Sequence, residues 1–258
     1  MNQQNRILFL ENVFDLPNPE FALVDPDGLV AVSPDLAPER LLFLYQHGFF
    51  PWYSPPDPML WWHPSNRCVL QPQHFHCSRS LKKAFARFKK QQGEIRVNYA
   101  FDDVIHHCCH LRQNEEGTWI SPDIIESFTH LHQQGYAHSV EVWHNNQLVG
   151  GFYGLAIGQI FFGESMFSLV PNASKFALLA LCQNAEALGI ELIDCQVESE
   201  HLLSLGAELM PRASFVEQLA HLIQANNVKV NKVQPTNRTP LELAQRNTLL
   251  LHTKQLPF

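Results

Sequence analysis

The sequence lacks the features that place a chain in a membrane or in an oxidising compartment. It has no stretch of 18 or more apolar residues, so no transmembrane helix is predicted. The opening run Met1-Asn2-Gln3-Gln4-Asn5 has neither the basic region nor the apolar core of a secretory signal. Only six cysteines are scattered through 258 residues, which does not suit a disulfide framework. We therefore expect reduced thiols and a cytoplasmic protein.

Motifs for phosphate loops, serine nucleophiles and metal sites are also missing. The chain has no Walker-type loop and no Gly-x-Ser-x-Gly elbow. The run His106-His107-Cys108-Cys109-His110 contains metal-ligand residue types, but no second ligand cluster lies at a familiar spacing. We therefore predict no metal and no cofactor.

Basic residues, by contrast, are concentrated in one short window. The chain has a net charge of −7, yet residues 76–99 carry seven basic residues against Glu94, a local net charge of +6. A helix is predicted at 78–90, because apolar residues recur there on one face. Such a basic helix in an acidic chain indicates contact with a polyanion such as RNA, and the plainer alternative is a solvated helix face. The residues expected to contact RNA are Arg79, Lys82, Lys83 and Arg87.

Helical and alternating patterns predict an α+β fold with a mixed sheet. A strand ending at Gly163, a helix closed by Gly189 and a strand at 191–197 form a crossover unit, which makes part of the sheet parallel. Other helices are expected at 38–46, 78–90, 121–135 and 214–225. We predict a small N-terminal domain at 1–63, a larger domain at 64–225 and a basic extension at 226–258, either disordered or in contact with RNA.

One carboxylate lies in an unusually apolar segment. Glu164 is enclosed by the run 161–168 (FFGESMFS), where an unpaired charge is costly unless something uses it. Asp194 and Gln196 follow about thirty residues later and share one face of a predicted strand. If the two strands are neighbours, these three side chains form the floor of an apolar pocket equipped for proton transfer. The alternative is a polar cluster that only satisfies strand ends.

Short strings spread along the chain carry its most specific signal. They are 36–42 (LAPERLL), 48–55 (GFFPWYSP), 60–62 (LWW), 78–80 (SRS), 116–120 (EGTWI), 137–143 (AHSVEVW), 162–168 (FGESMFS), 172–175 (NASK) and 193–197 (IDCQV). As an ordered set, running from about residue 20 to Arg212, they resemble the leucyl/phenylalanyl-tRNA–protein transferase family, although no single string carries the match.

The resemblance implies both an architecture and a reaction. The larger domain would have a GNAT-like (acetyltransferase) fold. The enzyme would move Leu or Phe, and less readily Met, from aminoacyl-tRNA to proteins that begin with Arg or Lys, marking them for N-end-rule degradation. Apart from the resemblance, we expect a monomer that uses neither a membrane nor a cofactor. Two other functions remain as alternatives for this chain, an acyl-CoA-dependent N-acetyltransferase and a non-catalytic RNA-binding module.

The same resemblance assigns roles to individual residues. Asp194 and Gln196 would form a proton relay, and Glu164 would hold the aminoacyl-adenosine end or the incoming N-terminus. Alternatively, these residues mainly position the two ends, because an aminoacyl ester is already activated. The basic helix would hold the tRNA acceptor stem. The residues implied to surround the aminoacyl group and its adenosine are Trp52, Trp119, Phe152, Phe161, Gly163, Met166, Leu178, Leu181 and Ile193.

Two positions depart from the family pattern. Phe128 stands where the family has Tyr, so a hydroxyl that could contact substrate is absent. Phe162 replaces a smaller residue beside Gly163, and we expect it to narrow the pocket.

Overall fold

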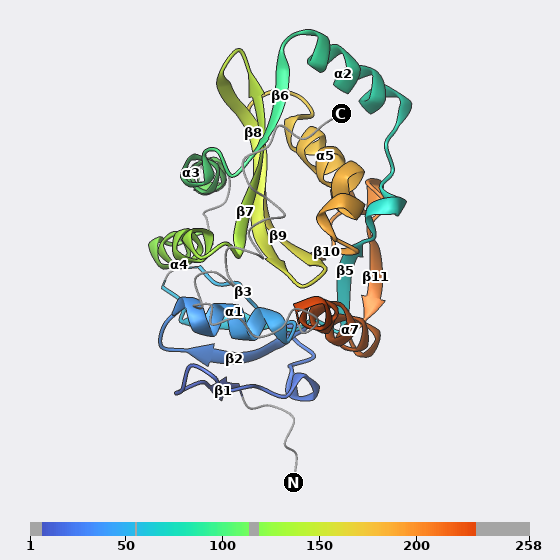
Figure 1. The fold of residues 1–258 in the computed structure, drawn as a ribbon. Helices are drawn as coiled ribbons and strands as arrows, with labels where there is room; N and C mark the ends of the chain where they lie inside the picture. The colour runs from blue at the N-terminus through green and yellow to red at the C-terminus, as the bar shows by residue number, and fades with distance from the viewer. Residues whose placement is uncertain (1–6, 55, 114–118, 231–258) are drawn as a thin grey trace.

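A computed structural model describes residues 7–54, 56–113 and 119–230 of the chain, and Figure 1 gives its arrangement. Two sheets and seven α-helices make up this described part, so the predicted α+β class is confirmed. The smaller sheet has the order β1-β2-β4-β3. Its strands are β1 (Leu8–Phe9), β2 (Leu29–Ser33), β3 (Phe50–Pro51) and β4 (Met59–Trp62).

The larger sheet has seven strands in the order β11-β5-β10-β9-β8-β7-β6. β9 and β10 pair in parallel and the other neighbours are antiparallel, as the crossover unit predicted. The strands are β5 (Asn66–Leu70), β6 (Gly93–Val97), β7 (Ala137–His144), β8 (Gln147–Ile157), β9 (Ile160–Ser168), β10 (Leu192–Gln196) and β11 (Glu208–Pro211).

Helices cover both faces of the larger sheet. α3 (Phe101–Gln113) and α4 (Pro122–Gln133) lie on one face, and α2 (Arg79–Lys90) and α5 (Ala173–Leu188) lie on the other (Figure 1). α1 (Pro38–Gln46) lies between the two sheets, and α7 (Arg212–Val230) lies beside β5 and β11. The short α6 (Glu200–Ser204) follows β10. None of the described helices has the length and hydropathy needed to cross a bilayer.

The helix ends follow from local sequence. Ser121 caps α4 by accepting from the backbone N–H of Ile124, with Pro122 in the first turn. Gly189 ends α5 in the left-handed conformation, at φ 68°. The last helix differs from expectation at both ends, because α7 runs from Arg212 to Val230 rather than from 214 to 225, and so includes the first residues of the predicted extension. The part of the predicted C-terminal extension at 231–258 lies outside the described residues.

Two β-bulges lie side by side on the parallel pair. In β9, Gly163 pairs with Gly154 and Ser165 with Tyr153, so Glu164 is the extra residue. In β10, Asp194 pairs with Val69 and Gln196 with Cys68, so Cys195 is the extra residue. The registered pairing between the two strands runs as far as Asp194 and Phe162. Because bulges bend strands and redirect side chains, β9 and β10 part beyond this point.

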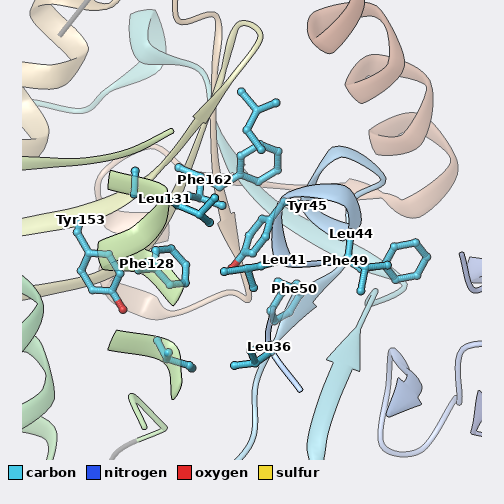
Figure 2. Close-up of a cluster of buried hydrophobic side chains, with 14 of the residues drawn as sticks. Leu36, Leu41, Leu44, Tyr45, Phe49, Phe50, Phe128, Leu131, Tyr153 and Phe162 are labelled. Carbon is cyan, nitrogen blue, oxygen red and sulfur yellow. The ribbon is translucent and has the colours of Figure 1, made fainter. Parts of the chain in front are cut away.

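The hydrophobic core joins the small sheet to the large one through α1. Tyr45 of α1 lies against Phe162 of β9 and Phe128 of α4, with ring centroids 5.4 and 6.4 Å apart (Figure 2). Both phenylalanines are completely buried. This packing fixes the Tyr45 hydroxyl relative to the bulge on β9, and it is the part of the fold that matters most for the site.

Candidate active site

A cavity of about 460 Å³ opens where β9 and β10 part. Its size lies in the range of small-molecule sites, and most of its surface is apolar. Its walls come from β3, β8, β9, β10, α5, the segment just before α4 and the segment that follows β10. The lining residues are Phe50, Pro51, Trp52, Trp119, Phe152, Phe161, Gly163, Glu164, Ser165, Met166, Leu178, Ile193, Cys195, Gln196, Val197, Glu198, Ser199, His201 and Leu202.

Glu164 is the carboxyl group at the polar end of this cavity. Its Oε1 accepts the Tyr45 hydroxyl at 2.6 Å and the Nε2 group of Gln196 at 3.2 Å. Both donors therefore converge on one oxygen. Among the described residues no hydrogen bond reaches Oε2, so that oxygen is the one available to a ligand.

The surroundings of Glu164 favour its neutral form. Burial raises its pKa to about 8, against a smaller lowering by the Tyr45 hydrogen bond; nearby Asp194 raises it further. The pKa of Tyr45 is raised well above its usual value by burial and by Glu164, so the phenol remains a donor. A carboxyl group that titrates near neutrality can accept and return a proton during turnover.

Asp194 lies behind the wall of the cavity rather than in it. Its two oxygens accept Nε and Nη2 of Arg67 at 2.8 and 2.7 Å, and both side chains are fully buried. Oδ1 also accepts the backbone N–H of Gln196 at 2.9 Å. Asp194 was expected on the pocket floor with Glu164 and Gln196, and the structure instead places it one layer deeper.

The structure gathers most of the other residues implied by the resemblance. Leu181 is the exception: it is fully buried among core residues and is not part of the cavity wall, because α5 presents Leu178 there instead. The predicted residues that do line the cavity are Trp52, Trp119, Phe152, Phe161, Gly163, Glu164, Met166, Leu178, Ile193 and Gln196.

The two departures from the family pattern lie outside the cavity. Phe162 is absent from its lining and packs on Tyr45, because neighbouring residues of a strand face opposite sides and Phe161 takes the cavity side. The expectation that Phe162 narrows the pocket is therefore wrong. Phe128 packs on Tyr45 and Tyr153 and does not line the cavity either.

Sequence reasoning missed several polar residues of the site. Tyr45 and Arg67 lie 119 and 127 residues from their partners Glu164 and Asp194, so no local pattern connects them. The short helix α6 was not predicted, and His201, which α6 brings to the cavity, was missed with it. Glu198 lies two residues after the end of β10, and only its position after the predicted strand could have indicated it.

A second cavity of about 230 Å³ shares Phe50, Trp52, Val197 and Glu198 with the first. Asp27 brings a second carboxylate to it, held by the backbone N–H and hydroxyl of Ser65 at 3.1 and 2.9 Å. Trp52 is 45% exposed, and the ring of Trp62 lies 5.6 Å from it. The second cavity is therefore acidic and aromatic, and it suits a cationic side chain.

The basic residues are exposed on α2, away from the cavity. Leu81, Phe85 and Phe88 pack inward, and the lysines and arginines between them face solvent. In the described part of the chain, Arg79, Lys82, Lys83 and Arg87 have no salt bridge to a carboxylate. Figure 1 places α2 at the end of the large sheet opposite the small sheet.

An α+β fold with an apolar cavity that ends on a carboxyl group titrating near neutrality fits an aminoacyltransferase, and comparison with known proteins places the chain in that class. The model described as leucyl/phenylalanyl-tRNA protein transferase matches residues 69–220, and a model for the N-terminal domain of that transferase matches residues 34–65. The chain belongs to the leucyl/phenylalanyl-tRNA–protein transferase family.

Curated relatives agree with this assignment. The leucyl/phenylalanyl-tRNA–protein transferase of Aliivibrio salmonicida (strain LFI1238) is 52% identical over 87% of this chain and 93% of its own length. That of Enterobacter sp. (strain 638) is 51% identical over 81% of this chain and 87% of its own. That of Shewanella baltica (strain OS155 / ATCC BAA-1091) is 47% identical over 91% of this chain and 96% of its own length. Among solved structures, L-PGS from Bacillus licheniformis matches at a TM-score of 0.38 and 10% identity, covering 86% of this chain and 73% of that one, a likeness too low to name the fold more finely than α+β.

Proposed function

We propose that the chain transfers Leu or Phe, and less readily Met, from aminoacyl-tRNA to the N-terminus of proteins that begin with Arg or Lys. The observation that carries the proposal is the apolar cavity that ends on Glu164 and Gln196. The product is marked for N-end-rule degradation, and the enzyme works as a cytoplasmic monomer without metal or cofactor. It consists of a small N-terminal domain (1–63), a GNAT-like domain (64–225) and a basic extension (226–258).

The aminoacyl side chain enters the apolar part of the cavity. Phe152, Phe161, Met166, Leu178 and Ile193 surround this space. Such a wall selects for size and apolar character and offers no hydrogen-bonding pattern, which explains tolerance for Leu, Phe and Met together. The rings of Trp52 and Trp119 also line the cavity and suit stacking on the terminal adenosine, and such contacts typically contribute about 1–3 kcal/mol per base.

Glu164 takes the proton that the acceptor must lose. The α-amino group of the acceptor has a pKa of about 7.7–8.0 in unstructured peptides, so near pH 7 it is mostly protonated. The pKa of Glu164 is raised to about 8 by burial, so transfer between the two groups is nearly balanced in energy. Oε2 is the oxygen left for this contact, since Tyr45 and Gln196 both donate to Oε1.

The reaction then closes without any further reagent. Glu164 first takes the extra proton of the ammonium group and passes it to solvent. The neutral amine nitrogen then forms a bond to the ester carbonyl carbon and gives a second proton to Glu164. The bond between that carbon and the ribose oxygen breaks, and the oxygen takes the proton back from Glu164. The products are a new peptide bond and a tRNA with a free terminal hydroxyl, and Glu164 is restored. Because the ester is already activated, positioning and proton handling supply the remaining catalysis.

The acceptor's first side chain occupies the second cavity. A basic side chain placed there meets Asp27 and Glu198 and the ring of Trp52 or Trp62. Since the two cavities share Phe50, Trp52, Val197 and Glu198, an amine at Glu164 is next to a side chain in the second cavity. This arrangement supports a preference for Arg or Lys over neutral residues.

The tRNA lies along the exposed face of α2. Arg79, Lys82, Lys83 and Arg87 offer unopposed charge to phosphates there, so affinity falls steeply as salt rises. The salt dependence is expected to be shallower in the double variant Arg79→Ala/Lys83→Ala, and equal slopes would contradict this role for the helix.

The reaction is tested by transfer of radiolabelled Phe from Phe-tRNA to a protein that begins with Arg, beside a matched protein that begins with Gly. Transfer to the Arg protein alone is expected. Transfer to both, or from acetyl-CoA instead of Phe-tRNA, would contradict the proposed function. Binding of tRNA with transfer to neither protein would reduce the chain to an RNA-binding module.

A further inference from the structure

Arg67 is fully buried in the layer behind the cavity, and the chemistry proposed above gives it no role. It holds both oxygens of Asp194, and the rings of Phe50 and Phe215 lie 4.6 and 4.7 Å from its guanidinium carbon. It therefore connects β10, β3 and α7 at one point. Among the described residues, its Nη1 has no hydrogen-bond partner.

Stability alone does not account for this arrangement. A buried ion pair is expensive to desolvate, and replacing one with apolar side chains of similar volume is often neutral or stabilising. An unsatisfied buried donor makes the balance poorer still. The rings of Phe50 and Phe215 leave an apolar slot in which an uncharged side chain would pack well. A role in shaping the site explains the charged pair better.

The ion pair is connected to the cavity through the backbone of Gln196. Oδ1 of Asp194, held by Arg67, accepts the Gln196 N–H. Gln196 has a φ of 56°, in the left-handed region that residues other than glycine adopt only when their surroundings require it. This bend at the bulge aims the Gln196 carboxamide at Oε1 of Glu164, 3.2 Å away. Loss of the anchoring bond would release the bend.

A second connection runs through Phe50. Its ring packs on the Arg67 guanidinium and also lines both cavities. The position of Phe50 therefore affects both the aminoacyl group and the residue of the acceptor next to it.

We propose that Arg67 is a positioning residue for aminoacyl transfer: through Asp194 it fixes the bend at Gln196, and through its own guanidinium it fixes Phe50. The proposal rests on the proposed function of the site. It assigns Asp194 a structural role in which Arg67 occupies both of its oxygens, so that the proton moves through Glu164 and not through an Asp194–Gln196 relay.

The test compares four proteins that all retain Glu164. Arg67→Met removes the positioning group and fills the apolar slot. The double variant Arg67→Gln/Asp194→Asn is neutral, but its Asn carbonyl can still accept the Gln196 N–H and its Gln amide can still donate to Asn. Arg40→Met is the matched control, because Arg40 is equally buried and ion-paired with Asp35 but lies outside both cavities. Wild-type activity is measured first, so that failure of the proposed function is recognised separately.

We expect Arg67→Met to lower kcat by about 10- to 100-fold with little change in KM for aminoacyl-tRNA, which is the signature of misplaced reacting groups. The neutral double variant should recover at least half of that loss on a logarithmic scale. Arg40→Met should lower the melting temperature and leave kcat within about twofold, as for a residue remote from the chemistry. All rates are taken well below each melting temperature.

Two results would overturn the proposal. If kcat of Arg67→Met equals that of Arg40→Met, Arg67 contributes only to folding. If the double variant is no more active than Arg67→Met, the carboxylate of Asp194 itself is required, as a relay would demand.

Discussion

The two acids of the site, Glu164 and Asp194, lie on neighbouring strands and have opposite surroundings. Glu164 meets the neutral donors Tyr45 and Gln196 on one oxygen, and burial raises its pKa to about 8. Asp194 meets the cation Arg67 on both oxygens. Neutral donors do not compensate a buried charge, whereas a guanidinium does. One acid is thus left free to exchange a proton, and the other is held as a permanent part of the framework.

Replacing Glu164 should give the largest effect on catalysis. Glu164→Gln keeps the size of the side chain and removes its ability to take a proton. Positioned acid–base groups contribute about 10²- to 10⁴-fold, so kcat for transfer of Phe should fall by that factor. The measurement is single-turnover transfer from Phe-tRNA at saturating acceptor. A loss below about tenfold would mean that Glu164 only positions the substrate.

Replacing Asp194 should have its largest effect on folding. Asp194→Ala leaves the Arg67 charge buried without a partner, and loss of one member of a buried pair costs about 3–5 kcal/mol. Urea denaturation should show this decrease in the free energy of unfolding. Asp35→Ala is the matched control, because its partner Arg40 is buried but Asp35 itself is exposed, and a smaller decrease is expected there. Equal decreases would remove the distinction between the two acids.

The pH dependence of stability separates the two acids further. Folding raises the pKa of Glu164 from 4.5 to about 8 through burial. Between these values the folded chain binds a proton that the unfolded chain has lost, so this contribution to stability is complete below pH 4.5 and declines as pH rises towards 8. The variant Glu164→Gln has no carboxyl group at this position, so it should not lose stability in this way as pH rises. The free energy of unfolding of Glu164→Gln, relative to that of the wild type, should therefore increase by a few kcal/mol between pH 5 and pH 8. One pKa unit corresponds to about 1.4 kcal/mol.

Urea denaturation at several pH values measures this difference, and titration of all other groups cancels between the two proteins. Glu217→Gln, at an exposed position of α7, is the control and should show no trend. A difference that is constant with pH would mean that Glu164 is already ionised when the protein is folded at neutral pH.

The pairing of β9 with β10 could be predicted from the sequence, but the bulges on these two strands could not. Helix ends at Ser121-Pro122 and Gly189 follow local rules, and the crossover between β9 and β10 follows from spacing. The bulges at Glu164 and Cys195 depend on how four strands, β8 with β9 and β5 with β10, register against one another, which no single segment encodes.

The hydrogen-bonding partners of the two acids could not be predicted from the sequence for the same reason. Tyr45 and Arg67 are ordinary residues of a helix and a strand, and only the packing of distant elements brings them to Glu164 and Asp194. The position of Asp194 one layer below the cavity depends on Arg67 in particular. Alternation along a strand predicts the face on which a side chain lies, but not how deep a partner will hold it.

The smallest expected effect concerns Tyr45, whose hydroxyl makes the neutral hydrogen bond that distinguishes Glu164 from Asp194. This bond lowers the pKa of Glu164 against the effect of burial, so Tyr45→Phe should raise that pKa further. A neutral hydrogen bond contributes about 1 kcal/mol, so transfer near pH 7 should slow by up to about fivefold as less Glu164 is ionised. The acid limb of the pH–rate profile should move to higher pH, and the difference from wild type should shrink above the new pKa.

The acceptor amine titrates in the same range, so both proteins must be compared with one acceptor. Tyr53→Phe is the matched control: Tyr53 is also buried, and its hydroxyl bonds to Ser121 outside the cavity lining. Its profile should coincide with that of the wild type. A Tyr45→Phe profile that falls by the same factor at every pH would show that the hydroxyl orients Glu164 without tuning its proton affinity. The contrast between the two acids would then rest on burial and Arg67 alone.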